Sequence, residues 1–397
     1  MSRFMNLFSR LLKFIGLDKG LVSVAGGNTI ASITGAVFWL FIATLMSTED
    51  YGHLNYYLSI AFLFGSLSML GLGTTVTTFL SKGEEDVRYQ ANLLVIFSNC
   101  AISVLLILLI NHLSIVLLLI GVSFFGMSQA EYLGRRNYKK YSYVTIVQRL
   151  LNVPLALLLY FIIGVDGIIL GYAVSTLLFS YNFFKSFKGF KPKFSYLKQK
   201  IPFIVHSYSL NISANVTSNV DKLLIAPLFG FGILGLYQIG FQFLIFLSII
   251  PTSLFQFLLP QEAARIQQKK IVIKGLIIAV VISTLFFIAI PAIITFIFPH
   301  FKESVEVSQI MIFGIIPLTL NMIMYSRFLE GEKSKAVFIS SCVRVSALLI
   351  LIFFLGSNYG LAGLGFATLI SLSLESISLL IMSRFQHNKK NSNHDTL

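Results

Sequence analysis

Charge is what this sequence has least of. Only 12% of its 397 residues are Asp, Glu, Lys or Arg, about half the share of an average soluble domain. The chain is 56% hydrophobic, with a mean hydropathy of +0.83, and apolar stretches recur from near residue 22 to residue 384. Its 38 Phe and 16 Tyr also exclude a disordered chain, which contains few aromatics. The composition therefore predicts a polytopic membrane protein.

Cysteine and catalytic motifs are equally scarce. The two cysteines, Cys100 and Cys342, lie in apolar stretches far apart, which excludes a disulfide framework and a CxxC metal site. The sequence has no Walker loop, no HExxH and no nucleophile elbow. We therefore predict no cofactor, no metal and no enzyme activity. A membrane-embedded glycan enzyme or polymerase stays an alternative, although the short external loops and the lack of clustered His and Asp weigh against it.

Apolar runs divide the chain into twelve spans, each close to the roughly 20 residues that an α-helix needs to cross a bilayer. If both termini are cytoplasmic, the cytoplasmic segments hold 26 basic residues and the external ones hold Lys302 alone. This asymmetry is the positive-inside pattern. It explains the net charge of +14 without a nucleic-acid site. The predicted spans are 24–46, 54–80, 91–110, 113–131, 141–163, 167–184, 201–227, 233–260, 272–298, 304–326, 335–356 and 359–383.

A weak internal repeat relates the two halves of the chain. At an offset of 183 Gly52 aligns with Gly235, and at 195 Arg149 aligns with Arg344. Six spans in each half give a parallel repeat, which predicts an all-α fold of two pseudo-symmetric six-helix lobes around a central cavity. The predicted parts are an amphipathic surface helix (1–20), an N-terminal lobe (21–184), a basic cytoplasmic loop (185–200), a C-terminal lobe (201–384) and a cytoplasmic tail (385–397).

Five charged residues lie well inside the predicted spans, away from their ends: Arg149, Asp221, Lys222, Arg344 and Glu375. A basic residue at the centre of a span costs about 2.5–3.5 kcal/mol on insertion scales, so each needs a partner, water or an anionic ligand. One interpretation is structural pairing, for example of Arg344 with Glu375. The other is a cationic cavity in which the arginines hold an anionic head group. Because adjacent helix positions point about 100° apart, Asp221 and Lys222 are expected to point in different directions.

The seventh span is the most polar in the chain. Its asparagines, including Asn211, Asn215 and Asn219, predict a helix that faces a wet cavity or a neighbouring helix. His206, one turn after Pro202, suggests either a simple hydrogen bond or a proton-coupling group.

Several segments resemble bacterial polysaccharide flippases. They are Glu49–Gly52, Gly71–Gly73, Ser218–Gly230, Gly235–Gly240 and Glu330–Lys333. The resemblance is to Wzx-type O-antigen flippases of the multidrug/oligosaccharidyl-lipid/polysaccharide exporter (MOP) superfamily. It covers the whole chain in span number and segment order.

The resemblance implies transport of undecaprenyl-diphosphate-linked oligosaccharide across the bacterial inner membrane by alternating access, driven by an H+ or Na+ gradient. A polysaccharide polymerase and chain-length machinery are implied as partners. By position, Arg149, Lys222 and Arg344 match cavity cations of such flippases, and Asp221 matches an aspartate of the family. Glu375, His206 and the three asparagines are cavity or ion-coupling candidates. The alternative is a cation-coupled multidrug antiporter of the same superfamily, although these exporters favour acidic cavities. Lipid II flippases are similar but usually have two further spans.

Overall fold

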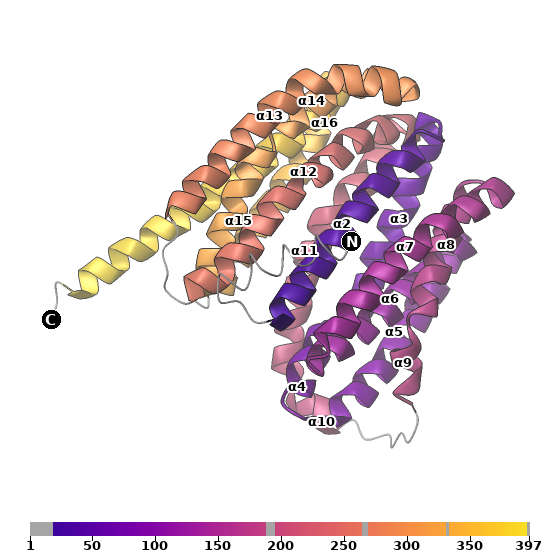
Figure 1. The fold of residues 1–397 in the computed structure, drawn as a ribbon, viewed down its shortest axis with the longest axis vertical. Helices are drawn as coiled ribbons and strands as arrows, with labels where there is room; N and C mark the ends of the chain where they lie inside the picture. The colour runs from indigo at the N-terminus through magenta and orange to yellow at the C-terminus, as the bar shows by residue number, and fades with distance from the viewer. Residues whose placement is uncertain (1–18, 188–194, 264–268, 331–332, 395–397) are drawn as a thin grey trace. The chain divides into compact units, whose positions relative to one another are not determined.

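The computed structural model describes residues 19–187, 195–263, 269–330 and 333–394, and every regular element in these ranges is a helix (Figure 1). Helices are what long apolar runs must form in a bilayer, because each backbone N–H and C=O must then bond within its own segment. The amphipathic helix predicted for the N-terminus falls outside the described residues, except for its last two. The predicted tail continues the last helix as far as His394.

The first half of the chain forms six helical segments at the positions of the predicted spans. They are α2 (Lys19–Ala43), α3 (Thr48–Ser68) with α4 (Leu72–Leu80), α5 (Asp86–Ile110), α6 (Leu113–Gly134), α7 (Tyr138–Ile163) and α8 (Val165–Leu178). The α3–α4 pair bends by 49°. The bend occurs where Leu70 and Gly71 adopt positive φ angles, 51° and 71°. Two short helices follow, α9 (Tyr181–Lys185) and α10 (Ser195–Gln199).

The second half repeats this plan. Its elements are α11 (Ile201–Phe229), α12 (Phe231–Ala263), α13 (Lys269–Ile297), the 3-10 helix η1 (Pro299–Ser304), α14 (Val305–Ile312), α15 (Ile315–Glu330) and α16 (Ser334–His394). The 61-residue α16 is not one continuous helix, because Gly360 has non-helical angles (φ 56°, ψ −134°). It therefore supplies both the eleventh and the twelfth predicted span.

Eight described helices are long and apolar enough to cross a membrane, or nine if the bent α3–α4 pair is one span. The second part of α16 is a further segment, and α8 is apolar but only 14 residues long. The polar residues of α11 make its composition too hydrophilic for a typical membrane span, although its 29 residues are long enough to cross a bilayer. The described helices thus coincide with the predicted spans, and the prediction of an all-α polytopic membrane protein is confirmed.

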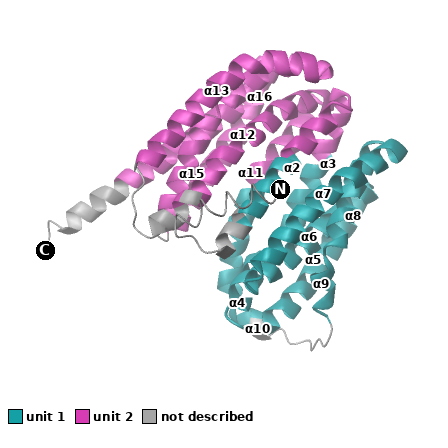
Figure 2. Cartoon of the chain, in the orientation of Figure 1, with its two compact units in different colours: residues 1–35, 57–215 teal, residues 36–56, 216–397 magenta. Residues whose placement is uncertain are grey.

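The chain folds as two compact units (Figure 2). Unit 1 comprises residues 1–35 and 57–215, and unit 2 comprises residues 36–56 and 216–397. The sequence places the division between lobes at 185–200. In the structure the hairpin formed by the end of α2 and the start of α3 belongs to unit 2, and the first half of α11 belongs to unit 1. Three helices are therefore shared between the units.

Each unit has an apolar core of its own. In unit 1, Leu72, Val95 and Phe124 are buried in one cluster, and Phe124 stacks on Phe183 with ring centroids 4.0 Å apart. In unit 2, a smaller cluster joins α15 to both parts of α16 through Phe328, Ala336 and Leu379. In a bilayer such packing contributes mainly van der Waals energy, since lipid tails are themselves apolar.

Two glycines bring α3 and α12 into backbone contact within unit 2. A Cβ added to Gly52 would collide with the carbonyl oxygen of Phe231, and one added to Gly235 would collide with that of Thr48. These glycines are the pair that aligns at an offset of 183 in the internal repeat. Small residues at helix interfaces allow such close approach in membranes. The repeat therefore places one glycine of each half at a single contact.

Gly235→Val is expected to destabilise unit 2, because no L side chain fits between α3 and α12. Overpacking of this kind costs typically 1–3 kcal/mol and more where backbone is the obstacle. The measurement is the melting temperature in detergent. Gly232→Val is the matched control, since nothing lies within 4 Å of a Cβ at this position in the same helix. Equal melting temperatures for the two variants would contradict the prediction.

Candidate functional site: charged residues of the spans

Arg149 lies in α7, in unit 1, and is half-buried. Its guanidinium lies over the ring of Tyr172 in α8, with Cζ 5.4 Å from the ring centroid. On another side, its Nη1 is 3.8 Å from the place of a Cβ on Gly35. Close packing of α7 and α8 positions it, since a Cβ on Gly171 would lie 2.6 Å from the backbone of Ala156. In the described part of the chain, no acidic side chain lies within ion-pair distance of Arg149.

Lys222 and Asp221 lie in α11 and are almost completely buried, with 5% and 1% of their surface exposed. The Lys222 ammonium donates to both carboxylate oxygens of Asp221, at 3.0 and 3.2 Å, and to the carbonyl oxygen of Ser218 at 2.9 Å. Adjacent helix positions do point about 100° apart, yet the two side chains pair with each other, which the sequence did not predict. The lysine stem has four flexible carbons, so its ammonium reaches back to the adjacent carboxylate although the two Cβ atoms diverge.

Arg344 lies in α16, where its Nη1 is 3.6 Å from Oε2 of Glu375. Glu375 is 1% exposed. It also accepts hydrogen bonds from Tyr325 and from Asn321 Nδ2, the latter at 2.9 Å. Ser376 in turn donates to Oδ1 of Asn321 at 2.6 Å. The structure thus contains the Arg344–Glu375 ion pair, which the sequence analysis gave as the alternative to a cationic cavity.

The two aligned arginines therefore have different surroundings. Arg149 in unit 1 contacts an aromatic ring, whereas Arg344 in unit 2 faces a carboxylate. Lys222 has its own carboxylate in the adjacent residue. In unit 2 the two cations of the spans, Lys222 and Arg344, are thus each paired with a buried anion. Of the three predicted cavity cations, only Arg149 lacks an acidic partner among the residues that the structure describes.

The polar face of α11 is bonded at several points. Asn211 Nδ2 donates to Oγ1 of Thr74 at 3.3 Å, and Asn215 Nδ2 donates to the carbonyl oxygen of Asn211 at 2.9 Å. Asn219 is buried and His206 is exposed. Within the described ranges, no group of three His, Cys, Asp or Glu residues is placed to hold a metal ion.

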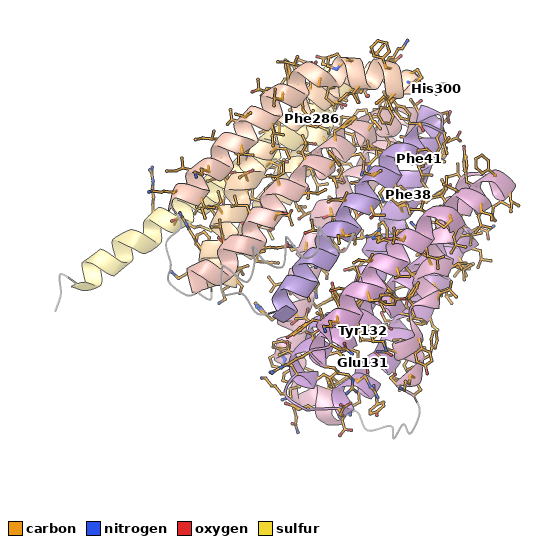
Figure 3. All side chains as sticks on the ribbon, viewed as in Figure 1. Phe38, Phe41, Glu131, Tyr132, Phe286 and His300 are labelled. Atoms are coloured by element: carbon orange, nitrogen blue, oxygen red, sulfur yellow. The ribbon has the colours of Figure 1, made fainter. Side chains whose placement is uncertain are left out.

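One charged cluster was not predicted from the sequence. Glu131, labelled in Figure 3, lies near the end of α6 and is 4% exposed. It accepts hydrogen bonds from Arg88 at 2.5 Å and from Arg135 at 2.9 Å. Arg135 also donates twice to Glu85, both at 2.7 Å. Burial lowers the pKa of Arg135, but the hydrogen bonds and charges of Glu85 and Glu131 outweigh it, so the pKa is raised. The only sequence signal is the four-residue spacing of Glu131 and Arg135 on one helix.

No family model matches the sequence, and comparison with curated proteins gives no match. Solved structures do match. The lipid II flippase MurJ, in an inward closed conformation, has a TM-score of 0.72 at 12% identity, over 89% of this chain and 87% of the flippase. An inward-facing multidrug resistance MATE transporter of the MOP superfamily has a TM-score of 0.65 at 12% identity, over 91% of this chain and 96% of the transporter.

An outward-facing structure of a MATE transporter of that superfamily also matches, with a TM-score of 0.60 at 12% identity, over 94% of this chain and 96% of the transporter. These likenesses extend over nearly all of each chain. The chain therefore has the fold of these flippase and transporter structures. The predicted membrane-protein class and the two-lobe, twelve-helix fold are thereby confirmed. Identities near 12% show only that the fold is shared, and both the flippase and the multidrug transporters have this fold.

Proposed function

We propose that this chain is a flippase for undecaprenyl-diphosphate-linked oligosaccharide, the repeat unit of O-antigen or another surface polysaccharide. It would act in the bacterial cytoplasmic membrane with both termini on the cytoplasmic side. Alternating access of its two lobes would carry the glycan and diphosphate across while the lipid tail stays in the bilayer. The observation that carries this proposal is Arg149, a cation within a span that has an aromatic contact but no acidic partner in the described structure.

A diphosphate supplies what Arg149 lacks. A guanidinium presents a planar fork of donors that suits the oxygens of a phosphate, and bidentate pairing adds geometric specificity. One charge pair at 4 Å is worth about 4 kcal/mol at an effective dielectric constant of 20. This exceeds the roughly 2.5–3.5 kcal/mol that an arginine costs at the centre of a span. The bound anion would therefore offset the cost of keeping Arg149 there.

Lys222 and Arg344 have lesser roles in this proposal. A phosphate that binds either of them must displace or outcompete the carboxylate already present, Asp221 or Glu375. We therefore assign the main diphosphate contact to Arg149. The polar α11, with Asn211, Asn215 and Asn219, would offer amide groups to the sugar hydroxyls.

Ion coupling would involve Glu375 rather than Asp221. Glu375 accepts hydrogen bonds from two neutral donors and is 3.6 Å from Arg344. A proton on this carboxylate would neutralise it and so take the place of the charge interaction with Arg344. Whether H+ or Na+ is the coupling ion would be decided by transport assays in gradients of each. His206 is the second candidate for a proton-binding group.

The multidrug-antiporter alternative receives less support from the charges. An organic cation would need an acidic side chain that is not neutralised. The three buried acids of the described structure are Glu131, Asp221 and Glu375, and each lies within ion-pair distance of a basic side chain.

Deletion of the gene is expected to abolish surface polysaccharide and to cause polyprenyl-diphosphate oligosaccharide to accumulate on the cytoplasmic side. The block lies at translocation, so the lipid-linked precursor is still made. Both quantities should be measured in one culture, with the wild-type gene on a plasmid as the control. Normal surface glycan together with new sensitivity to cationic drugs would refute the flippase and support the antiporter.

A further inference from the structure

We infer that the Lys222 ammonium occupies a monovalent metal-ion site built by α11, α12 and α16, and so acts as a tethered cation in place of Na+ or K+. This inference concerns a site inside unit 2 and is independent of the substrate proposed above.

The surroundings of the ammonium are oxygen atoms. Its three hydrogen-bond partners are both carboxylate oxygens of Asp221 and the main-chain carbonyl oxygen of Ser218, at 2.9 to 3.2 Å. Two hydroxyls lie behind the carboxylate and hold it in place: Tyr237 donates to Oδ2 of Asp221 at 2.8 Å, and the Thr368 hydroxyl oxygen lies 3.0 Å from the Tyr237 oxygen. Carboxylate, carbonyl and hydroxyl oxygens are the ligands that hard metal cations prefer.

The ammonium also lies over an aromatic ring. Lys222 Nζ lies 4.1 Å from the ring centroid of Phe241 in α12. An aromatic face attracts cations through its quadrupole. The hydrogen bonds and the aromatic contact of the ammonium therefore all favour a compact positive charge at the position of Nζ.

Tethering also explains why both residues are so deeply buried. An isolated carboxylate in this environment would need a counter-ion, since an uncompensated buried charge is strongly destabilising. Lys222 supplies that counter-ion covalently, so its occupancy does not depend on the ions in solution. The wild-type protein should accordingly have no requirement for Na+ or K+ at this position.

Removal of the ammonium should convert the site to one that binds a free ion. Lys222→Ala leaves Asp221 unpaired and vacates the volume of the lysine stem. Lys222→Met removes the same charge but fills that volume with an apolar chain. Melting temperatures of the purified full-length variants should be measured in NaCl, KCl and choline chloride at equal ionic strength, with Asp221→Asn/Lys222→Ala as the third protein.

The wild type is expected to melt at one temperature in all three salts. Lys222→Ala should melt on the order of 5 °C higher in NaCl or KCl than in choline chloride, by mass action of the bound ion. Lys222→Met and the double variant should show no such difference. If Lys222→Ala cannot be isolated in choline chloride, its recovery in NaCl or KCl is the same result.

Three outcomes would overturn the inference. One is a Lys222→Ala protein that melts equally in all salts. Another is an equal metal-ion effect in Lys222→Met, which would show that the ion acts elsewhere. The last is a Lys222→Ala protein that does not fold in any salt while Lys222→Met folds. Folding would then depend on filling the volume of the lysine stem and not on a bound cation.

Discussion

Arg149→Ala is expected to reduce export of lipid-linked oligosaccharide by at least about tenfold at normal protein levels. The change removes the guanidinium that the proposal assigns to the diphosphate, and loss of a charge-assisted hydrogen-bonded contact of about 1.5–3 kcal/mol corresponds to a factor of about ten or more. Stability should change little, because Arg149 has no carboxylate to leave behind in the described structure. The measurement is surface polysaccharide per cell in the deletion strain that carries the variant, with membrane protein quantified in parallel.

Two further variants make this result specific. Lys139→Ala removes a charge from an exposed position of the same helix and should leave export unchanged. Arg149→Lys keeps the charge but loses the planar fork of donors. If its level of export lies between those of the wild type and Arg149→Ala, the contact acts through charge alone. Export as low as that of Arg149→Ala indicates bidentate contact. Full export by Arg149→Ala would refute the assignment of Arg149 to the substrate.

Glu375→Ala is expected to lower the stability of unit 2 by about 3–5 kcal/mol, the usual cost when one partner of a buried ion pair is removed. Arg344 would lose its carboxylate, and Tyr325 and Asn321 would lose their acceptor. For a unit of this size the fall in melting temperature would be on the order of 10 °C. Thermal unfolding of the detergent-purified protein measures it.

A double-mutant cycle separates the ion pair from the other bonds. Arg344→Met/Glu375→Ala should recover part of the lost stability, because no uncompensated charge remains. Ser373→Ala is the control on the same helix, since its hydroxyl bonds only to the backbone of that helix. The double variant is compared with Arg344→Met and Glu375→Ala. If its loss of stability equals the sum of their two losses, the side chains do not interact and the ion pair has no energetic role.

The spans were predictable from the sequence because they depend on local properties, and the orientation stays a prediction. A segment inserts as a helix when its own residues are apolar, and the basic loops bias its orientation. The interruption of α16 at Gly360 lies next to the predicted boundary between the eleventh and twelfth spans. The bend at Gly71, inside the second predicted span, was not predicted, since an isolated glycine is common in membrane helices. The division into compact units was also not predictable in detail, because α2, α3 and α11 each contribute to both units.

The partners of the buried charges were decided by tertiary structure. Arg149 and Arg344 occupy equivalent places in the repeat, each nine residues after a basic residue, and sequence reasoning treated them alike. Their difference comes from the helices that pack against them: α8 presents Tyr172 to Arg149, whereas the second part of α16 presents Glu375 to Arg344.

The sequence by itself determined an all-helical membrane chain, its number of spans and the identity of its five intramembrane charges. Only the tertiary structure decided that four of them form two ion pairs and that Arg149 lies outside both pairs. The physical reason is distance along the chain. Insertion is settled within some twenty residues, whereas pairing depends on side chains that packing brings together, such as Arg344 with Glu375, or on how a flexible stem folds, as in Lys222.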